Sequence, residues 1–316
     1  MARAHGARAR LALAFETSYG TAPEAGYWQM PFVSSTLGAE QPLLSSELLG
    51  YGRDPQTPLA DVVTADGDVV VPIDTVAFGF WLKAAFGAPV TTGSAPGPFT
   101  HVFTSGDWDL PSMAIEVAMP EVPRYAMMAG CVLDQLSWQM TRGGLLTATA
   151  RLIAQGEALA EVSGIETPDV PEFRRFGHMQ GSISRNGVAL GSVVSAELTY
   201  ANGIDRIETI RADGRIEGAD PGMAALSGRL EVRFADQTLI DQAVAGDACA
   251  LSFGYALHSG ESLTLEVPAV FLPRPRVEIP GPQGIQASFD WQAARHAGVG
   301  RMCTVTLVNG VEGYQG

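Results

Sequence analysis

Residues Leu43 to Phe86 read LLSSELLGYGRDPQTPLADVVTADGDVVVPIDTVAFGFWLKAAF, and this stretch decides the fold. Its pattern predicts a strand, a glycine- and proline-rich loop, a second strand and a short apolar helix. Val69 to Ile73 has the β-branched composition of a strand buried against a helix. Thr75 to Phe86 carries six large apolar residues, which favours a helix packed on a sheet.

The predicted helix has start and stop signals at both ends. Asp74 and Thr75 are suitable caps, because a short side-chain oxygen can accept a hydrogen bond from an unpaired amide of the first turn. Gly87 and Pro89 follow the last apolar residue and predict the end of the helix.

Length and composition indicate two domains and a surface that does not grip phosphate. The chain has 316 residues, enough for two cores of about 150 residues each, and we divide it into 1–160 and 161–316. Only 17% of the residues are charged, which favours a protein that hides surface in an assembly. The net charge of −14 argues against a nucleic-acid reader, which needs basic patches.

Short apolar runs predict a mainly β protein. After the helix, strands are expected at 101–103, 113–118, 132–140 and 145–153, and the Gly143-Gly144 turn predicts a hairpin between the last two. Residues 155–171 are acidic and proline-containing and resemble a connection between domains. Further strands are expected at 179–184, 189–200 and 204–211, joined at Asn186-Gly187 and Asn202-Gly203, which both suit type I′ turns.

The second half of the chain repeats the first in outline, which predicts an internal duplication. The strand at 67–73 corresponds to 228–234, and each precedes a helix, the second one at 236–245. The strand at 112–117 is matched with 262–267. The later strands that carry Trp138 and Trp291 are matched as well.

No group of residues with catalytic or ligand-binding spacing stands out, so we predict no catalytic, cofactor-binding or metal-binding site. The five histidines are isolated, and the three cysteines are far apart and odd in number. Asp66 and Asp68 flank Gly67 without the spacing of a calcium loop. Asp107-Trp108-Asp109 is compatible with a carbohydrate site or with an exposed turn anchored by one aromatic ring. No membrane span is expected, and the basic N-terminus lacks the apolar region of a signal peptide.

Four segments resemble the tail tube proteins of long-tailed, non-contractile bacteriophages and of gene transfer agents. They are Phe15 to Pro23 (FETSYGTAP), Leu43 to Pro55 (LLSSELLGYGRDP), Gly67 to Asp74 (GDVVVPID) and Gly79 to Lys83 (GFWLK). The resemblance is densest between residues 15 and 87. It implies two tandem tail-tube β-barrel or sandwich domains, each with one flanking helix.

The resemblance also implies a structural virion protein that assembles with itself. Family members form rings whose inner wall is a continuous sheet, and stacked rings form a tube through which DNA passes. With two tube domains per chain, three chains would make a pseudo-hexameric ring; a hexamer with one tube domain and one decorating domain per chain is the alternative. Tail terminator and distal tail proteins are the other expected partners, with assembly in the host cytoplasm and no membrane contact.

Two sets of residues are candidates for roles in such a tube. The loop Gly50, Tyr51, Gly52, Arg53, Asp54 and Pro55 is a candidate for stacking between rings, or else a solvated surface connection. Acidic residues on or beside predicted strands could line the bore and repel the phosphate backbone, or else solvate the outer surface. The four candidates for the bore are Glu116, Asp134, Glu266 and Asp290.

A second function from a different class remains open on these residues. A secreted β-sandwich could bind carbohydrate or protein through Trp108 and its neighbours. An enzyme has less support, because the sequence offers no nucleophile and base at a recognised spacing.

Overall fold

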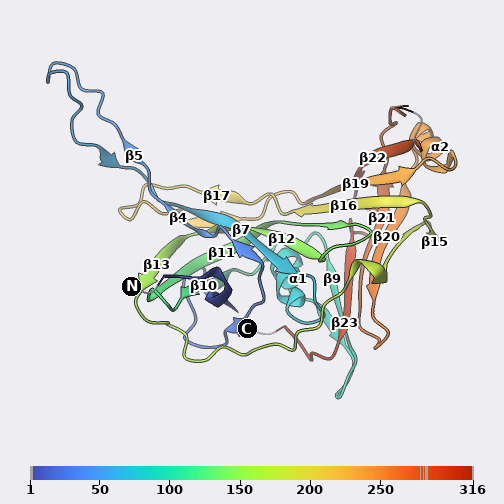
Figure 1. Ribbon diagram of the computed structural model, residues 1–316, viewed down its shortest axis with the longest axis horizontal. Helices are drawn as coiled ribbons and strands as arrows, with labels where there is room; N and C mark the ends of the chain where they lie inside the picture. Colours follow the sequence, from blue (N-terminus) through green and yellow to red (C-terminus); the bar gives the residue numbers. More distant parts are fainter. Residues whose placement is uncertain (1–2, 278, 280, 282–283, 315–316) are drawn as a thin grey trace.

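The structure is a computed structural model that describes residues 3–277, 279, 281 and 284–314 (Figure 1). Strands make up 45% of the chain and helices 7%, which confirms the predicted mainly β class. Nineteen of the described strands are joined by hydrogen bonds into one continuous network.

A long antiparallel sheet, the central sheet, crosses the molecule and contains strands from both halves of the chain. Each strand pairs with the next one across the sheet, from one edge to the other. In that order they are β4 (Gly38–Glu40), β7 (Thr64–Pro72), β12 (Thr147–Ala154), β11 (Arg124–Met140), β16 (Val193–Ala201), β19 (Ala225–Arg233) and β22 (Gln286–Ala293).

Two further sets of strands lie beside the central sheet. One set, in pairing order, is β2 (Trp28–Gln29), β1 (Arg10–Phe15), β10 (Met113–Met119), the first part of β11, and β13 (Gly156–Ala160). The other set is β15 (Val188–Ala189), β14 (Gly181–Arg185), β20 (Cys249–Ala256), β21 (Ser262–Phe271), β23 (Thr304–Asn309), β9 (Phe99–Thr104) and β8 (Val90–Thr92).

The remaining elements are short strands and helices. β3 (Ser34–Ser35) pairs with β7, and two small hairpins, β5–β6 (Leu43–Leu44 with Leu59–Ala60) and β17–β18 (Asp205–Ile207 with Gly218–Asp220), stand outside the main network. The helices are α1 (Phe78–Phe86) and α2 (Thr238–Ala245), and 3-10 turns occupy Gly6–Arg8 and His178–Gln180.

The first helix is the centre of the core. All residues of α1 except Lys83 are buried, and α1 lies beneath the central strands in Figure 1. The Phe80 ring packs edge-on against Tyr314, with ring centroids 5.2 Å apart. A Cβ on Gly79 would lie 2.0 Å from the Tyr314 ring, so only glycine permits this approach of the C-terminal segment.

The predicted caps of α1 differ in part from the structure. Asp74 Oδ1 accepts hydrogen bonds from the amides of Val76 (2.8 Å) and Ala77 (2.6 Å), in the turn that precedes the helix. Thr75 to Ala77 form that turn and not the first helical turn, so α1 begins three residues later than its apolar pattern indicates. Gly87, with φ of 85°, ends the helix as expected.

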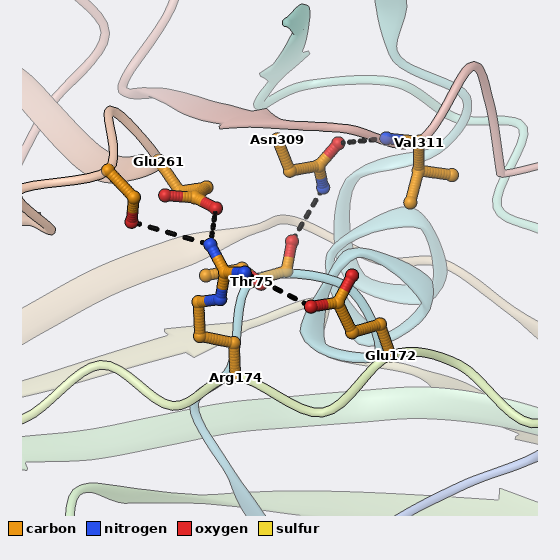
Figure 2. Close-up of polar contacts among 7 residues, drawn as sticks. Thr75, Glu172, Arg174, Glu261, Asn309 and Val311 are labelled. Carbon is orange, nitrogen blue, oxygen red and sulfur yellow. Dashed lines mark hydrogen bonds and ion pairs between the residues drawn. The ribbon is translucent and has the colours of Figure 1, made fainter. Parts of the chain in front are cut away.

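A polar cluster fastens the segment between the two halves of the chain to the core (Figure 2). The Arg174 guanidinium forms ion pairs with Glu261, beside β21, and with Glu172, whose carboxylate lies 3.1 Å away. The Thr75 amide donates to the Arg174 carbonyl (2.9 Å), and the Thr75 carbonyl accepts from Asn309 Nδ2 (2.6 Å). Because these contacts join the turn before α1 to the start of β21 and to β23, the connecting segment packs along both halves of the chain.

Several predicted boundaries are wrong for physical reasons. The acidic connection predicted at 155–171 begins with a strand, β13, because its backbone pairs with the first part of β11. At Asn202-Gly203 there is no type I′ turn. Asn202 is buried, and its side chain donates to the carbonyls of Ala85 (3.1 Å) and Leu133 (2.8 Å). The Asn186-Gly187 turn has positive φ at both residues, as predicted.

The pairing pattern of the first half recurs in the second half. The pairs β1–β10, β10–β11, β11–β13, β11–β12, β12–β7 and β7–β4 correspond to β14–β20, β20–β21, β21–β23, β21–β22, β22–β19 and β19–β16. Each half also places a hairpin before, and a helix after, its equivalent strand, β7 or β19. This pattern equates β10 with β20 and β11 with β21, so the sequence match of 112–117 with 262–267 and that of the Trp138 and Trp291 strands are each displaced by one strand. The boundary at residue 160 and the duplication itself stay predictions.

Candidate assembly surfaces

One face of the central sheet is polar and open to solvent, and we call it the polar face. In β16, buried Ala196, Leu198 and Tyr200 alternate with less buried Glu197 and Thr199, and the neighbouring strands show the same alternation. The charged residues at these outward positions are Asp66, Asp68, Asp134, Arg151, Glu197, Arg229, Glu231, Arg233 and Asp290.

Carboxylates outnumber arginines on the polar face. The Arg151 guanidinium lies 3.9 Å from Asp134, and Arg229 lies 3.7 Å from Glu231 and 3.8 Å from Asp290. Such exposed pairs add little to stability, but they offset the positive charge locally. The net potential of this face is therefore negative, which disfavours adhesion of a phosphate backbone.

The structure brings only two of the four predicted bore residues onto this face. Asp134 lies at a bulge of β11, and Asp290 is exposed on β22. Glu116 is only 5% exposed on β10, where Ser163 Oγ (2.7 Å) and the Gly164 amide (3.1 Å) donate to its carboxylate. Glu266 is exposed on β21, which belongs to a different sheet.

The predicted stacking loop is the tip of a long projection. Residues 41–63, the arm, leave the end of β4 and extend away from the body of the molecule, at the upper left of Figure 1. All residues of the loop Gly50 to Pro55 are exposed. Along the arm, Leu43, Leu44, Leu48, Leu49 and Leu59 are also exposed, Leu49 by 93%. A monomer rarely leaves so much contiguous apolar surface in water, so the arm has the character of a docking element.

The equivalent hairpin of the second half is packed against the molecule. The Gly214 carbonyl accepts from the Val63 amide (3.1 Å), and Arg215 Nη2 donates to the Glu157 carbonyl (3.1 Å). Arg206 forms an ion pair with Asp66. The β17–β18 hairpin thus lies on the first half of the chain, at the start of β7.

Both ends of the central sheet have open strand edges within the described part of the chain. At one end β4 pairs with β7 alone. At the other end β22 pairs with β19 along its length but with β21 only at Gln292 and Ala293. Unpaired edges template association with another strand, so these two edges are candidate contact surfaces.

A cleft of about 660 Å³ lies where the two halves meet at Trp108, whose side chain is 72% exposed. Met223, Ala293, Arg295 and Arg301 also line it. The exposed tryptophan is the one that the sequence suggested as a turn anchor or carbohydrate contact.

The buried titratable groups form structural contacts. His101 Nε2 lies 3.1 Å from Asn309 Oδ1, and its Nδ1 lies 2.8 Å from Thr91 Oγ1; burial lowers the pKa of this histidine. Burial raises the pKa of Asp74 to about 6, although the amides of Val76 and Ala77 act in the opposite direction. Within the described residues, no group of three or more His, Cys, Asp or Glu side chains could hold a metal ion.

Comparison with known proteins shows the family of the chain. The sequence model of the family described as phage tail tube protein matches residues 6–293. The chain belongs to the phage tail tube protein family. No curated protein matches the chain.

Membership of the tail tube family fits a structural component of a phage virion. None of the helices in the described residues has the length and apolar character to cross a membrane. Sequence reasoning predicted a loop at the tip of the arm from its glycines and prolines, but not the projection of the whole arm. It missed the open edges and the polar face as a whole, because these depend on which strands lie side by side.

Proposed function

We propose that this tail tube protein closes into rings, that the rings stack into a tube, and that DNA passes through the bore. The observation that carries the proposal is the junction between β11 and β16. There a strand of the first half pairs with a strand of the second half over Gln135–Met140 and Ala196–Ala201.

This junction within one chain supplies a template for the contact between chains. In the repeated pattern, β16 of the second half corresponds to β4 of the first half. β21 and the residues after it correspond to β11. The equivalent contact would join the open edge at β21 and β22 of one chain to the open edge at β4 of the next. Closure of the ring would then leave no unpaired edge in the central sheet.

Three chains per ring follow from two repeats per chain and the six tube domains that the family resemblance implies. The chain mass is 33.3 kDa, so a ring of three has a mass of about 100 kDa and a ring of six about 200 kDa. An open arrangement would leave two strand edges exposed, whereas a closed cyclic ring pairs each one.

The polar face supports a role as the wall of the bore. A wall that carries more carboxylates than arginines repels the phosphate backbone, so DNA slides instead of binding. Asp134 and Asp290 are the two sequence-predicted bore residues that fit this proposal. The tip of the arm is the part available to reach an adjacent ring. Tail terminator and distal tail proteins would close the two ends of the tube.

Electron microscopy of the purified protein, combined with light scattering over a concentration series, tests this function. We expect hollow rings or tubes, and a ring mass of about 100 kDa. A particle that stays at 33.3 kDa at every concentration would overturn the proposal.

A further inference from the structure

The two hairpins occupy equivalent places in the repeated pattern, so the site that holds one predicts the site that holds the other. The β17–β18 hairpin lies at Val62, Val63 and Ala154, which line a cleft of about 340 Å³ together with residues 206–216. In this cleft, Val62, Val63 and Ala154 belong to the first half of the chain and residues 206–216 to the second half.

Strand registers locate the equivalent positions in the second half. Gly67 lies opposite Leu152, and Gly228 lies opposite Trp291. Counting from these pairs, Val62, Val63 and Ala154 correspond to Met223, Ala224 and Ala293. These three residues line the cleft of about 660 Å³ beside Trp108. The cleft is therefore the second-half counterpart of the site that the β17–β18 hairpin occupies.

We propose that this cleft, the Trp108 cleft, receives the base of the arm of a neighbouring copy of the chain in the same ring. The inference rests on the proposed ring, because it needs a second copy with its β4 edge against the β21–β22 edge. Leu43, Leu44 and Leu59 of the neighbour lie against Trp108 and Met223. The tip of the arm, Gly50 to Pro55, extends beyond the cleft.

The direction of the arm identifies a neighbour as its source. β16 pairs with β11 of the first half, and the chain continues from β16 into the β17–β18 hairpin. That hairpin therefore lies on the first half. β4 leads into the arm, and within the described residues β4 pairs with β7 alone. The arm points away from its own body in Figure 1, so its base is free to contact another copy.

Apolar surfaces on the arm and the cleft are complementary. Leu43, Leu44 and Leu59 are 66%, 51% and 70% exposed, and in the cleft Trp108 is 72% and Met223 is 89% exposed. Large apolar side chains on two surfaces favour association, because contact removes their apolar area from water. An aromatic anchor at the centre of such a contact is typical of stable interfaces.

The charges are complementary as well. The arm carries three carboxylates, at Glu47, Asp54 and Asp61, and one arginine, and Glu40 lies just before it at the end of β4. Arg295 and Arg301 line the cleft, and neither forms an ion pair within residues 3–277, 279, 281 and 284–314. Opposite charges on the two surfaces guide the arm to the cleft and select this contact over others.

Cross-linking between singly substituted chains tests the docking. Cys131, Cys249 and Cys303 are buried, so a short bis-maleimide reacts with a newly exposed cysteine in preference to them. Chains with Leu44→Cys are mixed with chains with Met223→Cys, assembled and treated, and covalent dimers are identified by peptide mass spectrometry. The matched control replaces the Met223→Cys chain by a Val62→Cys chain, substituted at the equivalent position in the first half.

We expect abundant cross-links between positions 44 and 223 and at least tenfold fewer between positions 44 and 62. Rings that show no preference for the Met223 position would overturn the arm docking and leave the ring proposal standing. A protein that forms neither rings nor cross-links would overturn both proposals. As a second variant, Trp108→Ser in an unchanged background should lower the yield of rings several-fold, while the thermal unfolding of the monomer stays unaltered. An unchanged yield of rings would contradict the docking.

Discussion

The hairpins β5–β6 and β17–β18 hold the same place in the two halves of the chain, yet their surroundings differ. The β17–β18 hairpin contacts the first half through Gly214, Arg215 and Arg206. The arm that contains β5–β6 projects into solvent with its leucines exposed. The difference teaches that the same pairing pattern can hold one hairpin against the chain and leave its counterpart exposed.

Among the variants that test this comparison, deletion of the arm loop should have the largest effect on assembly. Replacement of residues 45–58 by a two-residue Asn-Gly turn removes the exposed leucines of the loop but no described contact to the body. We expect rings that no longer stack into tubes, because the tip is the part that reaches an adjacent ring, and a change of less than about 1 kcal/mol in the free energy of unfolding of the monomer. Light scattering and urea unfolding measure the two quantities.

The matched deletion in the second half gives the opposite result. Replacement of residues 208–217 by the same turn removes the contacts of Gly214 with Val63 and of Arg215 with Glu157. The monomer should lose about 1–3 kcal/mol of stability, since partly buried hydrogen-bond partners are left unsatisfied and the contacts of the hairpin with the first half are removed. Equal effects of the two deletions on monomer stability would contradict the distinction between the hairpins.

Two equivalent glycines provide a second comparison. A Cβ on Gly228 would lie 2.0 Å from the Glu197 carbonyl and 2.5 Å from the Trp291 ring, both in long paired strands. A Cβ on Gly67 would lie 2.6 Å from the Leu37 backbone, which belongs to an edge segment. Gly228→Ala should cost about 3 kcal/mol and Gly67→Ala somewhat less, as measured by urea unfolding. Gly143→Ala, which meets open space, is the control and should cost almost nothing.

Two aspartates before the helices should give opposite pH dependence. Burial raises the pKa of Asp74 to about 6, against roughly 3.9 in the unfolded chain. Its contribution to stability is present at low pH and is lost as the pH rises from about 4 to 6. Asp74→Asn should therefore become more stable relative to the wild type over that range, by about 2 kcal/mol.

Asp236, before α2, is exposed, and the Thr238 amide that donates to it lowers its pKa. Its stabilisation is present at neutral pH and is lost as the pH falls below about 4. Asp236→Asn should be the less stable protein at neutral pH and approach the wild type in acid. Thermal unfolding between pH 3 and 7 measures the stability of both variants relative to the wild type. The same pH dependence in both variants would contradict the opposite pKa shifts of the two aspartates.

Changes on the polar face should have the smallest effect on stability. Glu231→Gln with Asp290→Asn leaves Arg229 without its two ion-pair partners, while the exposed pairs themselves contribute less than about 1 kcal/mol. We expect normal rings that retain DNA weakly at low salt, with retention that falls steeply as salt rises. Filter binding detects this, and rings with unchanged DNA retention would count against a bore lined by the polar face.

The sequence alone predicts the elements whose stability is local. The valines of β7, the apolar run of α1 and the Asn186-Gly187 turn each act through neighbouring residues, so their patterns are readable. The loop at the tip of the arm follows in the same way from its glycines and prolines, whereas the strand expected at 43–49 is limited to Leu43–Leu44.

Features that depend on distant strands could not be predicted. β13 forms in an acidic segment because β11 offers it an edge, and Glu116 is buried because Ser163 and Gly164 cover it. Asn202 reaches two backbone carbonyls that only the fold brings near. The sequence match of 112–117 with 262–267 is displaced by one strand because alternating apolar residues look alike in any strand. Hydrogen-bond pairing distinguishes the strands.

A cryo-electron microscopy reconstruction of the assembled ring tests the central claim most directly. The claim predicts three chains around a bore lined by the polar face, with the β21–β22 edge of each chain beside β4 of the next. A ring of six chains, or a ring whose polar face points to the outside, would contradict it.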